Sequence, residues 1–160
     1  MQIRDFVADD LPFLREMLYT AALWRPEDAA QIPMDVALAD PQLAIYHEGW
    51  GRPGDTALIA VDGERRVGAV FYRLFTEQEH GHGYVNDDTP ELGIAVVADA
   101  RRRGVGRALM EAAAERARSD GVRRMALSVN DDNPSKLLYA SLGYLDYEPD
   151  DGRGRMILDL

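Results

Sequence analysis

Apolar residues at the start of the chain recur first with the spacing of a strand and then with that of a helix. Ile3, Phe6 and Val7 alternate with charged residues, which predicts a strand. Asp10 is expected to cap the helix that follows, with Pro12 in the first turn, where its missing N–H does no harm. The helix is predicted from apolar residues at helical spacing: Leu11, Leu14, Met17, Leu18 and Ala21.

Two β-rich runs in the middle of the chain predict a hairpin. They are residues 56–62 (TALIAVD) and 65–75 (RRVGAVFYRLF), and Asp62-Gly63 between them indicates a tight turn. The flanking stretches have weaker patterns. Residues 25–56 are expected to hold one short helix around residues 36–38. Residues 76–89 are rich in glycine and acidic residues without periodicity, so an exposed loop is expected.

The second half has the pattern of a β-α-β unit. Residues 91–97 (ELGIAVV) and 122–130 (VRRMALSVN) predict two parallel strands around a helix over 104–119, which Gly121 ends. The apolar stripe of that helix is Val105, Ala108, Leu109, Ala112 and Ala113. A short helix over 133–143 should follow.

The chain should end in a hairpin formed by residues 144–149 and 154–160. The whole order predicts an α/β fold of the mixed type, with a twisted, mostly antiparallel sheet of roughly six to seven strands and about four helices on both faces. No repeat or second domain is detected, so residues 1–160 are expected to form a single domain.

Composition narrows the class of protein. The 160 residues are 46% hydrophobic and 29% charged, which is typical of a globular chain, and the lack of cysteine excludes disulfides, thiolate metal sites and a cysteine nucleophile. There is no secretion signal and no apolar run of the ~20 residues that cross a bilayer, so we expect a cytoplasmic protein without a membrane partner. A net charge of -10 argues against a nucleic-acid partner and favours cationic ones through long-range attraction.

Against this acidic background, one turn concentrates positive charge. Three arginines and two glycines stand between a predicted strand and a predicted helix, where unpaired N–H groups and the helix dipole favour an anion. A diphosphate would fit, and a plain helix start is the alternative. The backbone amides concerned are those of Arg102, Arg103, Gly104, Val105, Gly106 and Arg107. Leu109 stands where the dinucleotide motif needs a third glycine, and no Gly-Lys-Ser/Thr is present, so two other nucleotide motifs are excluded.

Together, these segments resemble the GNAT superfamily of N-acetyltransferases. Arg101, Gly104 and Gly106 match its Gln/Arg-x-x-Gly-x-Gly/Ala motif for the diphosphate of acetyl-CoA. A second family signature is matched by Asn133, Tyr139, Leu142, Gly143 and Tyr144, with one residue fewer between the first two than some members show. The close match covers about residues 87 to 145. The resemblance implies a GNAT-like fold, acetyl-CoA as cosubstrate and no metal.

The resemblance also implies a catalytic pair. Tyr139 would be the general acid, because phenol and thiol pKa values of roughly 10 and 8.5 are close enough for proton transfer to the departing thiolate; the alternative is a core tyrosine. Glu91 would be the general base, and strand alternation places small Gly93 and Ala95 on its face. The alternative is a solvated glutamate, with residues 87–88 (two aspartates) in reserve.

Other residues would hold the cosubstrate. The resemblance implies that Val96 and Val97 bind pantetheine through their backbone, with the Val97 N–H as oxyanion donor. Asn133 either reaches the pantetheine arm or caps the helix that begins near Pro134, and both alternatives stay open. His80 and His82 are two potential zinc ligands without clear partners, so they are expected to be loop residues, which would lie over the acceptor if they act at all.

Two function classes stay open at this point. One is an N-acetyltransferase in which a small-molecule or peptide amine attacks the thioester directly, since no cysteine can form a thioester enzyme. The other is a catalytically silent CoA-binding regulatory module. An interaction protein without a cofactor would leave the arginine-glycine turn unexplained. Trp24 and Trp50 are candidates for the acceptor pocket or for the core, and such domains often pair, so a homodimer is an open alternative.

Overall fold

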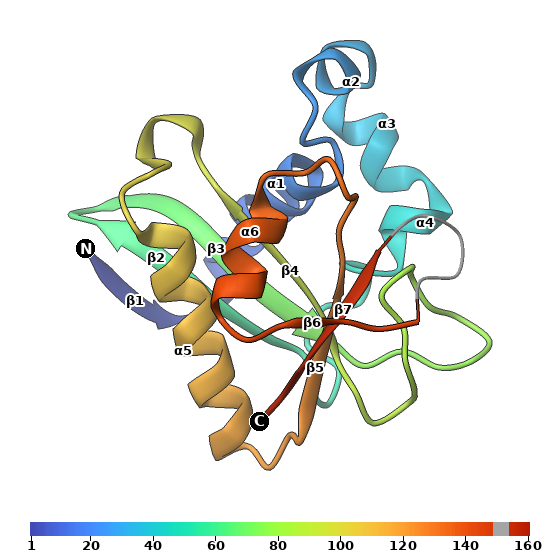
Figure 1. Cartoon of the computed structure of the whole chain (residues 1–160). Coiled ribbons are helices and arrows are strands. Elements are labelled where there is room, and N and C mark those ends of the chain that lie inside the picture. Colours follow the sequence, from blue (N-terminus) through green and yellow to red (C-terminus); the bar gives the residue numbers. More distant parts are fainter. Residues whose placement is uncertain (149–153) are drawn as a thin grey trace.

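A seven-stranded sheet forms the centre of the molecule (Figure 1). The computed structural model describes residues 1–148 and 154–160. Strand order is β1-β2-β3-β4-β5-β7-β6, and only β4 and β5 run parallel. This confirms the predicted mixed, mostly antiparallel sheet. The strands are β1 (Gln2–Asp5), β2 (Thr56–Asp62), β3 (Arg65–Arg73), β4 (Glu91–Val96), β5 (Arg124–Ser128), β6 (Leu145–Asp146) and β7 (Arg155–Asp159).

Helices cover both faces of this sheet (Figure 1). The described residues form six α-helices, which is more than the expected four: α1 (Leu11–Ala22), α2 (Pro26–Gln31), α3 (Met34–Ala39), α4 (Pro41–Ala44), α5 (Val105–Ser119) and α6 (Ser135–Ser141). Leu14, Met17 and Leu18 of α1 are buried on one face. The apolar stripe of α5 is buried on the other, together with Tyr139 of α6. The sheet therefore separates two cores.

Asp10 does not cap α1 as predicted. Its side chain accepts a hydrogen bond from the Val7 N–H at 2.9 Å, which caps the short 3-10 turn Ala8–Asp10 instead. The carboxylate is fully buried between Arg4 of β1 and Arg66 of β3. Two guanidinium partners outcompete the N–H groups of the helix, because a buried carboxylate needs opposite charge.

The segment 25–56 contains three short helices where one was predicted. Each begins at or directly after a proline: Pro26 and Pro41 are first helical residues, and Pro33 precedes α3. The fixed φ of proline suits the start of a helix, so these three prolines could have been used to predict three helix starts. None of the three helices has a full amphipathic stripe, which explains why periodicity missed them.

The loop after α4 is held by a buried ion pair. Arg73 of β3 binds Asp55 through two nitrogens, at 2.8 and 2.7 Å, and also donates to the carbonyl oxygens of Ile45 and Glu48. Trp50 packs against this guanidinium and against Phe6, and the Arg73 Cζ atom lies 5.1 Å from the centre of the Trp50 ring. Trp50 is therefore a packing residue.

Strands β4 and β5 diverge soon after they meet. The recorded register between them is the pair Glu91–Ala126, whereas β3 and β4 pair from Glu91 to Val96. Strand β5 is also shorter than predicted. The sheet therefore opens beyond Glu91, and this opening positions the site.

The terminal hairpin is present as predicted, but in the part that the structure describes its first strand is shorter than residues 144–149. Leu145 and Asp146 of β6 pair with Ile157 and Met156 of β7. Residues 149–153, at the predicted turn, lie outside the described residues. Across residues 1–148 and 154–160, no helix combines the length and apolarity needed to cross a membrane.

Candidate active site

Glu91 is held as a buried carboxylate where β4 begins. Glu91 is 3% exposed, so the alternative of a solvated glutamate is wrong. The Tyr46 hydroxyl donates to Oε2 at 2.6 Å, and the Gly83 N–H donates to Oε1 at 2.6 Å. Burial raises the pKa of Glu91, although both hydrogen bonds and nearby His80 act in the opposite direction. A carboxyl group with a raised pKa is suited to take a proton near neutral pH.

The loop before β4 closes tightly around this carboxylate. A Cβ atom on Gly83 would overlap the Glu91 carboxylate, and one on Gly81 would overlap the Tyr46 hydroxyl. Gly83 is itself buried, so residues 81–83 are part of the site rather than a fully exposed loop as predicted. Two glycines are therefore required here by close approach. The two faces of β4 alternate as predicted, because Leu92 belongs to one core and Ala95 to the other.

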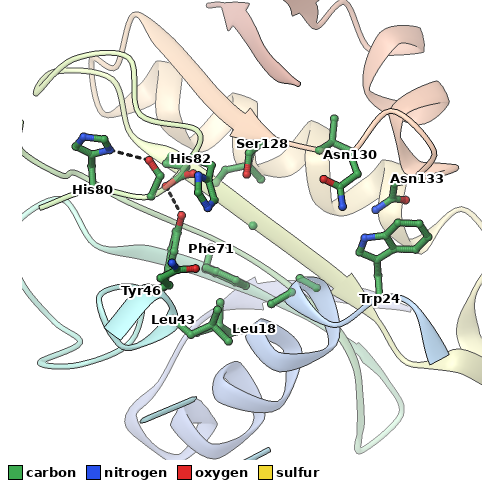
Figure 2. Close-up of a pocket in the computed structure, with 18 residues that line it drawn as sticks. Leu18, Trp24, Leu43, Tyr46, Phe71, His80, His82, Ser128, Asn130 and Asn133 are labelled. Atoms are coloured by element: carbon green, nitrogen blue, oxygen red, sulfur yellow. Dashed lines mark hydrogen bonds between the residues drawn. The ribbon is translucent and has the colours of Figure 1, made fainter. Parts of the chain in front are cut away.

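Glu91 is one of the residues that line a cavity of about 570 Å³, which is drawn in Figure 2. The cavity is bounded by α1 and the segment after it, α4 and the segment after it, the loop 80–82, the start of β4, and the end of β5 with the segment after it. Its lining residues are Leu18, Ala21, Ala22, Trp24, Gln42, Leu43, Tyr46, Phe71, His80, Gly81, His82, Glu91, Leu92, Gly93, Ser128, Val129, Asn130 and Asn133. Trp24 thus lines the cavity, whereas Trp50 does not appear in this set. Tyr46 was not singled out from the sequence.

The backbone of β4 faces the opening between β4 and β5. The Val97 N–H donates to the Val67 carbonyl oxygen at 2.9 Å, on the β3 side. This corrects the expectation that Val97 supplies the oxyanion donor. Since hydrogen-bonding directions alternate along a strand, Ile94 and Val96 direct their N–H groups into the opening. The Val96 carbonyl oxygen accepts from Arg101 Nε at 3.0 Å, as this direction requires.

The arginine-glycine turn precedes α5 as predicted, and its side chains are exposed at residues 101–104. Arg102 and Gly104 both have left-handed backbone, with φ of 60° and 81°. Such alternation of backbone hand forms concave groups of N–H donors that bind anions. The first N–H groups of α5 have no acceptor within the helix. A Cβ on Gly104 would meet no atom within 4 Å, so the space in front of the turn is open.

Side chains around this turn are already anchored in part. Arg107 donates to the Ser141 hydroxyl of α6 at 2.7 Å, and the Val105 side chain is buried in the core. Leu138 of α6 lies 3.5 Å from the position of a Cβ on Gly106. Helix α6 therefore packs beside the beginning of α5.

Tyr139 lies on that same helix and is 8% exposed. Burial raises its pKa to about 12, so the phenol is protonated at neutral pH. Tyr139 is not among the residues that line the cavity beside Glu91. Tyr139 belongs to the same core cluster as Val105 and Leu109 of α5. Both the acid and the core-tyrosine readings are compatible with this position.

Asn133 is part of the cavity lining, and its side chain is used locally. Oδ1 accepts from the Ser135 N–H at 2.9 Å, just ahead of α6. This supports the capping alternative for the carbonyl oxygen. The amide nitrogen is a separate donor group, which a carbonyl of a bound molecule can use.

The remaining candidate residues have other surroundings. Asp87 accepts from the Tyr84 hydroxyl, and Asp88 lines a different cavity of about 610 Å³. His80 stacks on Tyr84 with ring centres 4.3 Å apart, and both His80 and His82 line the cavity of Glu91. The described residues contain no group of three His, Cys, Asp or Glu placed to hold a metal ion.

Comparison with known proteins agrees with this geometry. The family model described as "Acetyltransferase (GNAT) family" matches residues 16–144. The chain belongs to the GNAT acetyltransferase family. This confirms the resemblance seen in the sequence, and membership supports acetyltransferase activity.

Individual relatives are more distant. The chain is 30% identical over 128 residues to a mycothiol acetyltransferase of Actinosynnema mirum; the match covers 79% of this chain but 38% of that protein, so the chain spans about two fifths of the relative's length. The ribosomal-protein-alanine N-acetyltransferase of Brucella melitensis has a TM-score of 0.70 at 22% identity, with both chains fully covered. The Salmonella typhimurium protein yncA, solved with its cofactor acetyl-CoA, has a TM-score of 0.72 at 20% identity, covering 100% of this chain and 94% of that one. These two structures share the GNAT fold.

Proposed function

We propose that residues 1–160 form a single-domain, acetyl-CoA-dependent N-acetyltransferase. The observation that carries the proposal is the buried Glu91 carboxylate, which lies in a cavity next to the opening between β4 and β5. A GNAT chain with a carboxyl group at this place can bring an amine, a base and a thioester together. Membership of the family supports the transfer of an acetyl group. The cavity beside Glu91 supports the proposal that an amine accepts it.

The cosubstrate would lie along the opening between the strands. Backbone N–H groups of residues 102–107 would bind the diphosphate, with Arg101 and Arg103 adding charge at the exposed turn. The pantetheine arm would follow the free edge of β4, where Ile94 and Val96 supply N–H groups. The Asn133 amide nitrogen would donate to one of its carbonyl groups. Acetyl-CoA supplies the acetyl thioester, and the chain supplies its position.

Glu91 would accept the proton of the bound amine. A free alkylammonium has a pKa of ~10.4, so most of it is protonated at neutral pH and needs a base before it can attack. The amine nitrogen then forms a bond to the carbonyl carbon, and the carbon–sulfur bond breaks. An N–H of Ile94 or Val96 would stabilise the negative charge on the carbonyl oxygen. Tyr139 would give its proton to the departing thiolate. The nitrogen would lose its remaining extra proton to solvent, from which Tyr139 recovers a proton, and Glu91 would release to solvent the proton that it accepted.

The first test is loss of the base. Glu91→Gln should lower kcat by about 10²- to 10⁴-fold, the usual contribution of general acid–base catalysis, without weakening acetyl-CoA binding. Thiol release from acetyl-CoA with a panel of primary amines measures kcat, and calorimetry measures affinity. Glu77→Gln removes an exposed carboxylate of the same loop and should leave both values unchanged. Full activity of Glu91→Gln would exclude Glu91 as the base.

The second test concerns the acid. Tyr139→Phe should lower kcat while acetyl-CoA affinity stays within twofold or so, as expected for a group that acts in the transition state. Equal kcat values in the same thiol-release assay would leave Tyr139 as a core residue. If the wild-type protein binds acetyl-CoA but releases no thiol with any amine, the catalytically silent CoA-binding module becomes the better description.

A further inference from the structure

The cavity beside Glu91 carries very little charge for a protein with a net charge of -10. Among the lining residues, which all belong to the described part of the chain, Glu91 is the one carboxylate, and none is a lysine or arginine. Glu91 already accepts hydrogen bonds from Tyr46 and Gly83. One carboxylate can serve one ammonium group, and it leaves no counter-charge for a second.

Several acidic residues of the chain form ion pairs outside the cavity. Asp10 and Asp55 are buried against arginines away from the cavity, and Asp99 binds Arg65 on the surface. The net charge therefore describes the exterior and the ion pairs, not the acceptor site. Long-range attraction of cations, expected from composition, does not predict how many charges the cavity accepts.

The two sides of the cavity differ in polarity (Figure 2). Leu18, Leu43 and Phe71 lie close together on one side, with Trp24 at one end. Ser128, Asn130 and Asn133 lie across from the leucines and come from the end of β5 and the segment after it. The first side can bury an apolar group, and Ser128 and Asn130 on the second offer uncharged donors and acceptors to an amide or hydroxyl.

We infer that the acceptor is a compact primary amine that carries one apolar group and no second charge, such as an aminoacyl amide with an aromatic side chain. The inference rests on the proposed function and adds the substrate class. A polyamine would place an unpaired ammonium against leucine and phenylalanine, and a free amino acid would bring its carboxylate into a cavity whose lining holds the Glu91 carboxylate and no lysine or arginine. Both arrangements are unfavourable because buried charge needs opposite charge.

Three probes separate these classes. Phenylalaninamide, phenylalanine and spermidine are compared by kcat/KM in the thiol-release assay and by calorimetric binding to protein saturated with coenzyme A. Phenylalaninamide should exceed each of the other two by about tenfold or more in both measurements, since a site without a counter-charge discriminates strongly. A kcat/KM or affinity for spermidine or phenylalanine that equals that of the amide would overturn the inference.

A matched pair of variants tests the charge argument directly. Gln42→Glu adds a second carboxylate to the cavity lining, and Gln31→Glu adds the same charge on α2, outside it. Gln42→Glu should raise the spermidine-to-phenylalaninamide ratio of kcat/KM by about tenfold, whereas Gln31→Glu should leave that ratio unchanged. An equal effect of both variants would show that net charge, not the cavity, selects the acceptor, and would overturn the inference.

Failure of the inference differs from failure of the proposed function. If thiol is released but spermidine is the preferred amine, the transferase proposal stands and the substrate class is wrong. If no amine releases thiol, the transferase proposal fails. The affinities of the three probes for the coenzyme A-saturated protein then still decide the inference, because they report the same cavity without chemistry.

Discussion

Tyr46 controls the carboxylate on which the proposed chemistry depends. Its hydroxyl and the Gly83 N–H each hold one oxygen of Glu91, so the carboxyl group has a fixed direction before any amine binds. Burial and the neighbouring carboxylate raise the pKa of Tyr46 well above its usual value, so Tyr46 stays a donor at every pH of interest. Because its hydrogen bond stabilises the ionised form of Glu91, it also limits how far burial can raise the pKa of that group.

Removing this hydroxyl should therefore shift a pH profile. In Tyr46→Phe the pKa of Glu91 rises further, so the acid limb of the kcat/KM profile should move to higher pH, by roughly one pH unit for a hydrogen bond worth about 1.4 kcal/mol. The other groups around Glu91 are His80 and His82 in the loop that closes on it and Arg73 at the paired position of β3, which binds Asp55. They are unchanged by the substitution.

A control separates this effect from altered packing. Phe75 lies edge-on to the Tyr46 ring at 5.1 Å, so Phe75→Leu perturbs the same ring and keeps the hydroxyl. Its acid limb should stay where the wild-type limb lies. Equal limbs for Tyr46→Phe and the wild type would mean that Tyr46 only fills space.

At the level of a single element, Gly104 is the residue that matters most for the proposed diphosphate site. It lies between η2 (Ala98–Ala100) and α5, where the first N–H groups of the helix are exposed. Gly104→Asp places a carboxylate at the proposed diphosphate site, and Gly104→Asn places a neutral group of the same shape there. Both side chains tolerate left-handed backbone better than most, so the strain is matched. Calorimetry should show acetyl-CoA binding at least about tenfold weaker for the aspartate than for the asparagine variant. Equal affinities would remove the diphosphate from this turn.

Elements with a strong period were predictable from sequence, and elements defined by their partners were not. The α5 stripe and the β2–β3 hairpin each carry a local pattern, and the structure contains both. The direction of the Val97 N–H depends on pairing with Val67, thirty positions earlier in the chain, and no local pattern encodes it. Tyr46 likewise becomes part of the site only when the segment after α4 packs against the start of β4.

Across the whole molecule, aspartate–arginine pairs join segments that are distant in sequence. Arg116 of α5 binds Asp5 of β1, and Arg25 after α1 binds Asp132 before α6. These pairs are exposed and contribute little individually. The buried pair of Arg73 and Asp55, with side chains 2% exposed, and the cluster around Asp10 are different, because a buried charge that loses its partner is strongly unfavourable. The fold of this acidic chain therefore depends on ionised carboxylates.

Asp10 makes that dependence measurable as a function of pH. Hydrogen bonds from Arg4, Val7 and Arg66 hold its folded-state pKa well below the usual range, so its contribution to stability is present above its unfolded pKa of ~3.9 and is lost as the pH falls toward the folded value. Asp10→Asn should lower the free energy of unfolding at pH 7 by about 1–3 kcal/mol. The gap to the wild type should narrow between about pH 5 and pH 3.5.

Urea unfolding at each pH measures this gap, and Asp9→Asn is the matched control. Asp9 is the exposed neighbour of Asp10, so its substitution should change the free energy of unfolding by less than about 0.5 kcal/mol at every pH. A gap for Asp10→Asn that stays constant down to pH 3.5 would show that folding does not lower the pKa of Asp10. The ion pairs with Arg4 and Arg66 would then add nothing to stability, and the link between β1, the 3-10 turn and β3 would have to come from packing alone.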